Sequence, residues 1–115
     1  MKVLFVATKK NRDPSERELY ELDFMIDVLG YKRSLVDLGI LTAAAATPAD
    51  VDVEIVDEYV DAIPYDTDAD LVALSAKTSC APHAYDVADE FRRRGKRVAL
   101  GGIHGSLRPE EALEH

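Results

Sequence analysis

The sequence has one cysteine and no tryptophan among its 115 residues. A single cysteine excludes an internal disulfide and any cluster held only by cysteines of this segment. No apolar run approaches the roughly 20 residues that a membrane-spanning helix requires. The first apolar run, VLFVA, is far shorter than the apolar core of a signal peptide. These absences predict a cytoplasmic protein with no membrane partner.

Positive charge is also scarce. The chain has 14 basic and 22 acidic side chains, and its formal net charge is −8. A nucleic-acid-binding surface needs a basic patch, so nucleic acid is not an expected partner. The basic stretch at residues 92–97 is better explained by cations at the end of a helix, where they suit the helix dipole.

The signatures of several α/β enzymes are missing. There is no GxGxxG, no GxxxxGK[ST] and no GxSxG. Where a phosphoryl-receiver domain carries acids, this chain has Thr8 and Ser75, and the loop after the first strand lacks the glycine of a flavodoxin-type phosphate loop. The histidines are too dispersed to predict a metal site. With no visible nucleophile–base pair, the segment alone is not expected to be catalytic.

A strand–loop–helix–strand unit is present at residues 70–102. The apolar run at 71–74 is typical of a strand that is covered on both faces. Pro82 suits the first turn of the following helix, and Gly95 suits its end. Its apolar stripe consists of Ala84, Val87, Ala88 and Phe91. Residues 98–100 form the next strand, and this unit is expected to be a right-handed βαβ crossover.

The remaining elements flank this unit. Residues 3–7 predict a central strand, and residues 51–56 predict an edge strand that is apolar through Val51, Val53 and Ile55. Residues 16–29 are interpreted as a helix or as a partly ordered excursion over the sheet edge. Residues 103–109 predict a loop, and Pro109 begins a further helix.

A helix is also predicted over residues 35–46, with Ser34 as its cap. Its interior glycine, Gly39, suggests the close approach of a neighbouring group. The side expected to be buried consists of Leu35, Leu38, Leu41 or Thr42, and Ala45.

These elements predict an α/β fold with a flavodoxin-like (Rossmann-like), doubly wound parallel sheet in one domain, residues 1–115. A five-stranded sheet of this kind needs one more strand and helix. We therefore expect either a chain truncated after strand four or one domain of a larger protein. The closing Leu113-Glu114-His115 is either native or the start of a histidine tag.

Doubly wound folds bind ligands at the carboxyl ends of their strands. Thr8 begins the loop at the end of the first strand, and His104, which follows the double glycine, is a candidate ligand contact. His83 is expected to be an exposed residue in the first turn of a helix. Asp57 and Glu58 are interpreted as solvated acids rather than general bases.

The single cysteine, Cys80, lies near the start of the helix in the strand–loop–helix–strand unit. A helix N-terminus favours a thiolate, so a reactive thiol is one hypothesis. The simpler interpretation, which we adopt, is a small side chain that fills space in the loop.

Several segments occur in a characteristic order: DLGILTAAAATP, VDE after the second strand, DLVALS with a threonine three residues later, AYDVADEFRRRG, and GGIH followed by PEEAL. This ordered set resembles the N-terminal cobalamin-binding domain of cobalamin-dependent radical SAM proteins. The resemblance covers residues 31–115 and the first strand.

The resemblance implies that cobalamin lies over the carboxyl edge of the sheet, with its dimethylbenzimidazole tail between strands and helices. Ser75 and Thr78 match hydroxyl positions that line the tail, where they can pair with polar atoms that are costly to bury alone. Gly101 and Gly102 match a double glycine that lets the tail approach the backbone. Thr8 and His104 complete the candidate cofactor-binding residues: Ser75, Thr78, Gly101, Gly102, His104 and Thr8.

One motif of the better-known cobalamin domains is missing. Those domains carry DxHxxG after the first strand, and its histidine ligates cobalt, whereas this chain has TKKNRDP there. No metal-ligating residue is therefore predicted in this segment.

The resemblance predicts a cobalamin-binding module that presents its cofactor to a downstream radical SAM core in the same polypeptide. That core would hold S-adenosylmethionine and a 4Fe-4S cluster and carry out methyl transfer or related radical chemistry. The alternative is a degenerate domain that binds no cofactor and acts as a structural or substrate-access domain. Bulky side chains such as Leu107 or Tyr85 in the tail channel would favour this alternative.

Overall fold

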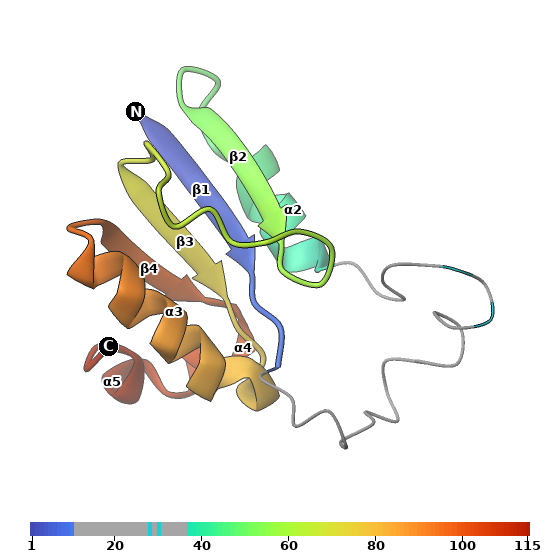
Figure 1. The fold of residues 1–115 in the computed structure, drawn as a ribbon, viewed down its shortest axis with the longest axis vertical. Helices are drawn as coiled ribbons and strands as arrows, with labels where there is room; N and C mark the ends of the chain where they lie inside the picture. The colour runs from blue at the N-terminus through green and yellow to red at the C-terminus, as the bar shows by residue number, and fades with distance from the viewer. Residues whose placement is uncertain (11–27, 29, 31–36) are drawn as a thin grey trace.

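A four-stranded, all-parallel sheet forms the centre of the computed structural model, which describes residues 1–10, 28, 30 and 37–115 (Figure 1). Its strands, in the spatial order β2-β1-β3-β4, are β2 (Asp52–Asp57), β1 (Lys2–Ala7), β3 (Leu71–Ser75) and β4 (Arg97–Gly101). The central position of the first strand and the edge position of the second are confirmed. The predicted helix at 16–29, except residue 28, and the predicted cap Ser34 lie outside the described residues.

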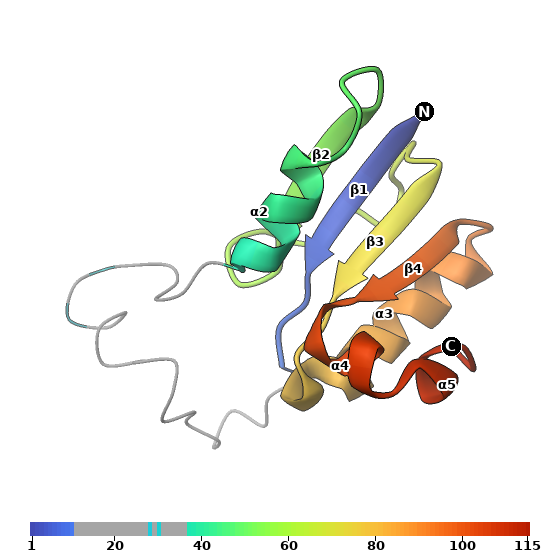
Figure 2. The ribbon, with the colours of Figure 1, turned by 180° about the vertical axis from the view of Figure 1, so that it is seen from behind.

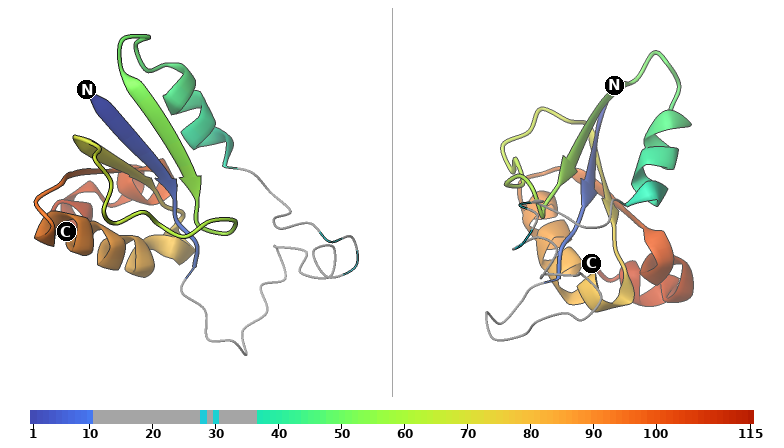
Figure 3. Two further views of the ribbon diagram at one scale, coloured as in Figure 1. Left: turned by 45° about the horizontal axis from the view of Figure 1, so that its top comes forward. Right: turned by 90° about the vertical axis from the view of Figure 1, so that its right-hand side faces the viewer.

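Helices cover the two faces of the sheet. Figures 1 and 2 show α3 (Ala81–Arg93) on one face and α2 (Leu38–Ala45) on the other, and the edge-on view in Figure 3 shows the sheet between them. Parallel neighbours need such crossover connections, because a tight turn can join only antiparallel strands. The flavodoxin-like α/β fold is thus confirmed. Within the described part of the chain, no helix is long and apolar enough to cross a bilayer.

The α3 face holds the larger part of the core. Leu4 and Val6 of β1 are fully buried there, and Phe91 of α3 is also inaccessible to solvent. The predicted stripe is confirmed, because Ala84, Val87, Ala88 and Phe91 are all buried. Burying one large apolar side chain stabilises the fold by about 1.5–3 kcal/mol, so this face contributes most of the packing energy.

The end of α3 follows the predicted glycine signal. Gly95 has a φ of +80°. Its N–H donates to Arg92 O at 2.9 Å, and the N–H of Lys96 donates to Phe91 O at 3.0 Å. These two bonds define a Schellman motif, which satisfies carbonyls that the helix end leaves without partners.

The prediction for α2 was wrong about the residue at which the helix begins and about the side of the helix that is buried. The helix begins at Leu38, and Asp37 is its cap. Ile40 is its buried residue and packs with Ala44 against β1, whereas Leu38 and Leu41 are 72% and 39% exposed. Two apolar stripes compete in this alanine-rich segment, and contact with the sheet selects the stripe that contains Ile40.

The side of β2 predicted to be buried is only half covered. Val53 and Ile55 lie on the same face as Val3 and Phe5, as the parallel register requires. They remain 39% and 43% exposed, and the buried residue of this strand is Val56, on the other face. The eight-residue α2 is too short to shield the whole sheet face above β2.

The loop predicted after the double glycine is instead a short helix, α4 (Gly102–Leu107). It is followed by α5 (Pro109–Ala112), whose proline start and acidic first turn are confirmed. Composition alone favours a loop, since α4 contains two glycines and a serine. Tertiary contacts hold it: the N–H of His104 donates to Ala76 O at 3.1 Å, and its side chain is buried.

Candidate functional site

A cavity of about 510 Å³ opens on the α2 face of the sheet, toward the carboxyl ends of β3 and β4. In Figure 2 the α2 face of the sheet is turned to the viewer. Its volume is in the range of about 300–1,000 Å³ that is usual for small-molecule sites. The apolar lining consists of Phe5, Gly39, Ile40, Ala43, Ala73, Leu74, Ala76, Ala99, Leu100 and Ile103, together with the double glycine.

On the α2 face, the wall formed by β4 has only small residues. Ala99 and Gly101 are its inward-facing residues, and a Cβ built on Gly101 would meet nothing closer than Leu74 O at 3.8 Å. That separation is an ordinary contact, so the missing side chain leaves free space. A flat group can therefore lie against the backbone at this position.

Gly102 is required for a different reason. Its φ is +84°, and a Cβ there would lie 2.8 Å from Ala76 O and 3.1 Å from Ser75 Oγ. The 3-10 helix η1 (Thr78–Cys80) follows β3. The segment that joins β3 to η1 approaches Gly102 so closely that no side chain fits there. The two glycines of the motif thus divide two tasks: Gly101 opens the cavity, and Gly102 lets the backbone turn.

Ser75 is held at the cavity from two sides. Its hydroxyl donates to Asp37 Oδ2 at 2.9 Å, and Asp37 Oδ1 accepts the N–H of Ile40 at 3.3 Å. A Cβ on Gly39 would lie 3.2 Å from the same Oδ1, which is the close neighbour predicted for that glycine. On the other side, Ser75 O accepts the hydroxyl of Thr8 at 2.9 Å and its N–H at 3.3 Å.

The predicted site residues separate into those at the cavity and those elsewhere. Ser75, Gly101 and Gly102 line it. Thr8 is buried behind Ser75, and Thr78 is exposed at the start of η1; neither belongs to the lining. Sequence reasoning missed two polar lining residues, Asp37 and Lys77. For Asp37 a signal existed, since aspartate directly before an apolar helix is a common cap.

His104 lies away from the cavity lining. Its Nε2 shares a 2.9 Å hydrogen bond with the hydroxyl of Tyr85, which also donates to Glu111 at 3.2 Å. Burial, followed by the hydrogen bond to Glu111, raises the pKa of Tyr85 above its usual range. The His104 Nδ1 atom is buried without a partner among the described residues. This network packs α4 and α5 against α3.

The predictions that Glu58 is solvated and that His83 is exposed were both wrong. Their side chains are only 9% and 16% exposed, and Glu58 Oε1 lies 2.7 Å from His83 Nε2. Glu58 Oε2 accepts the N–H of Lys9 at 3.0 Å. The pair therefore ties the end of β2 to the loop after β1 and to the first turn of α3. No local signal predicts a contact between side chains 25 positions apart.

Cys80 is buried and 4% exposed, as expected for a side chain that fills space. The part of the chain that the structure describes holds no group of three His, Cys, Asp or Glu side chains arranged to bind a metal ion.

No protein-family model matches the sequence, and no solved structure matches it. Two curated proteins of Chlorobaculum tepidum do. The chain is 51% identical over 79 residues to bacteriochlorophyllide d C-8(2)-methyltransferase and 34% identical over 80 residues to bacteriochlorophyllide d C-12(1)-methyltransferase. Each match covers 68% of this chain but only 17% and 18% of the respective relatives. The chain is therefore related to a limited segment of methyltransferases.

Proposed function

We propose that this chain is the cobalamin-binding segment of a radical SAM methyltransferase whose substrate is a tetrapyrrole of the bacteriochlorophyllide type. Two features of the sequence support this: its ordered motifs, and its similarity to two bacteriochlorophyllide methyltransferases. The observation that carries the proposal is the cavity at the carboxyl edge, with open space above Gly101 and the Ser75 hydroxyl in its lining.

The lining of the cavity suits the chemistry of the cobalamin tail. The tail ends in a flat, largely apolar base, and the lining offers alanine and glycine surfaces against which a ring can lie. Burying that base removes apolar area from water. The Ser75 oxygen, whose hydrogen is donated to Asp37, can still accept a hydrogen bond from a polar group of the tail. When bound, cobalamin supplies the cobalt chemistry of methyl transfer, while the protein binds and orients it.

Leu107 and Tyr85, whose presence in the channel would favour the degenerate-domain alternative, do not fill it. Leu107 is 68% exposed, and Tyr85 packs against His104. Neither residue belongs to the cavity lining. The space therefore favours a domain that holds a ligand.

The partner of this segment would be the rest of the same polypeptide. The matched region is a small fraction of each relative, so most of a methyltransferase of this kind lies in other segments. We infer that a downstream radical SAM core holds S-adenosylmethionine and a 4Fe-4S cluster, and that the present segment binds cofactor without being catalytic alone.

Retention of corrin by the 115-residue chain tests the proposal. The purified chain is mixed with hydroxocobalamin, freed of unbound cofactor by gel filtration, and examined by visible absorbance. We expect retained corrin with a base-off spectrum, because the tail is inserted in the protein. A protein that is folded by circular dichroism but colourless would overturn the proposal.

Gly101→Val gives the site-specific version of this test. The new Cβ makes only an ordinary contact, with Leu74 O at 3.8 Å, and the larger side chain takes up space at the cavity. We expect a folded protein that no longer retains corrin. Ala62→Val, at an exposed position between β2 and β3, is the matched control and should retain it. Equal retention by the two variants would place the tail elsewhere.

A further inference from the structure

Lys77 is a cation at the opening of the cavity without a partner among the described residues. It follows Ser75 by two positions, lines the same cavity and is exposed to solvent. Its ammonium makes no hydrogen bond or ion pair with any described residue. Three other cations are engaged: Lys2 pairs with Glu54 and Asp68, Arg94 with Glu90 and Asp66, and Arg108 with Glu111. Arg97 is exposed and, like Lys77, has no partner among the described residues, but it does not line the cavity.

Asp37, the acidic residue of the cavity lining, already accepts hydrogen bonds from other protein groups. One oxygen of Asp37 accepts the Ser75 hydroxyl, and the other accepts the N–H of Ile40. The chain has a net charge of −8, so the electrostatic potential around it is mainly negative. Lys77 adds a positive charge at the opening of the cavity, and no described residue neutralises it. A ligand with a negative group would supply the missing partner.

We propose that Lys77 binds the phosphodiester of the cofactor tail, so that the cavity selects complete cobalamin over corrinoids that lack the nucleotide. This inference rests on the proposed function. The apolar base suits the alanine- and glycine-lined interior, whereas the charged phosphodiester is costly to bury and stays near solvent. Lys77 stands where the lining meets solvent, and lysine binds phosphate as a point charge.

Affinity measurements with two corrinoids test this. Dissociation constants for cyanocobalamin and for dicyanocobinamide, which lacks the nucleotide and its phosphodiester, are measured by spectroscopic titration. The variants are Lys77→Ala, Lys77→Arg and the control Arg97→Ala, which removes an exposed cation at the opposite end of β4. Lys77→Ala should bind cyanocobalamin about three- to fivefold more weakly at low ionic strength, as expected for a solvent-exposed ion pair.

Three further results are expected. Lys77→Arg retains the wild-type affinity, Arg97→Ala is unchanged, and the effect of Lys77→Ala disappears with dicyanocobinamide. The difference should also shrink toward none near 1 M salt, where the screening length falls to about 3 Å.

The outcomes separate the two proposals. If the wild type binds neither corrinoid, the proposed function fails, and the role of Lys77 fails with it. If the wild type binds cyanocobalamin and Lys77→Ala binds it equally well, only the role of Lys77 is overturned. The same holds if Lys77→Ala weakens both corrinoids by the same factor, because the contact would then be to the corrin ring.

Discussion

The hydroxyl of Ser75 donates a hydrogen bond to Asp37 Oδ2 at 2.9 Å, across 38 positions of the chain. The bond joins the carboxyl end of β3 to the residue that caps α2. Because both residues line the cavity, one contact fixes the start of a helix and two walls of the site. Stability of the fold and shape of the site therefore depend on the same carboxylate.

Replacing this carboxylate should destabilise the domain. Asp37→Ala removes the cap of α2 and the partner of Ser75, and loss of a cap costs about 0.5–2 kcal/mol. We expect urea denaturation to show a loss of about 1–2 kcal/mol in the free energy of unfolding. Asp37→Asn preserves the capping oxygen and should lose less. If the alanine and asparagine variants have equal midpoints, the cap does not contribute as described.

The two adjacent glycines should respond differently to alanine. Gly102→Ala forces a side chain into the left-handed region and within 2.8 Å of Ala76 O, and such strain costs about 1–3 kcal/mol. Gly101 has a φ of −123° and open space, so Gly101→Ala should leave thermal unfolding nearly unchanged. The comparison is internal, since both variants add one methyl group. Equal losses of stability would contradict the assigned division of tasks.

The Glu58–His83 pair should contribute to stability through coupling. His83→Ala removes the nearest side-chain partner of a carboxylate that is 9% exposed and leaves it only the ammonium and backbone N–H of Lys9, so we expect a loss of about 1–3 kcal/mol. A double-mutant cycle with Glu58→Gln and His83→Ala isolates the interaction, and residues in contact show coupling of about 0.5–3 kcal/mol. Additive losses in urea denaturation would mean that the two side chains act independently.

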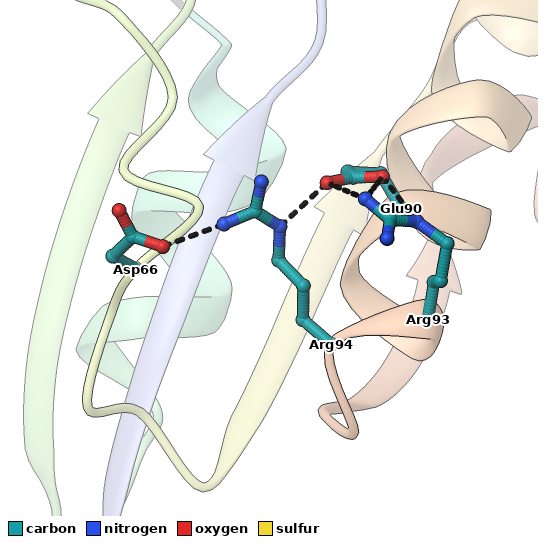
Figure 4. A network of polar contacts seen from close by, with 4 residues as sticks. All are labelled: Asp66, Glu90, Arg93 and Arg94. Carbon is teal, nitrogen blue, oxygen red and sulfur yellow. Dashed lines mark hydrogen bonds and ion pairs between the residues drawn. The ribbon is translucent and has the colours of Figure 1, made fainter.

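Acid should weaken the polar network at the end of α3. Figure 4 shows Glu90 between Arg93 and Arg94, with Arg94 also paired to Asp66. Hydrogen bonds from Arg93 and then Arg94 lower the pKa of Glu90 below its usual value of 4.5. A lowered folded-state pKa gives stability that is fully present above pH 4.5 and is lost as the pH falls through the folded value.

The midpoint of urea denaturation as a function of pH checks this. The difference between the wild type and Glu90→Gln should be positive at pH 7 and shrink below pH 4.5, and salt should reduce it. Asp86→Asn, which changes an exposed acid on the same helix, is the control. A difference that stays constant into strong acid would show that Glu90 acts through packing instead.

The parts of the fold that were predicted have local signals. The strands at 71–74 and 98–100 are short apolar runs, and the helix between them has Pro82 at its start and Gly95 at its end. Each of these signals depends only on residues that are adjacent in the sequence, so the secondary structure can be predicted from the sequence without knowledge of the fold. The choice between two apolar stripes in α2 depends on contact of Ile40 with β1, and a segment does not carry that information by itself.

The site was partly predictable for the same reason. Ser75 and Gly101 stand at strand ends, where a parallel sheet gathers its ligand contacts. Lys77 stands in the loop after β3, but only the structure shows that it lines the cavity and has no partner in the part of the chain that is described. The burial of Glu58 and His83 depends on three segments that meet in space, so their local sequence suggested solvated residues.

The small footprint of α2 has a consequence for the motions of the molecule. This helix buries one side chain, that of Ile40, whereas α3 buries six. Releasing α2 exposes little apolar area, so its backbone amides exchange hydrogen with water through a local opening of low free energy, while those of α3 exchange only with deeper unfolding. A ligand in the cavity touches α2 and the sheet together, and it therefore slows exchange in α2 well before it alters exchange in α3.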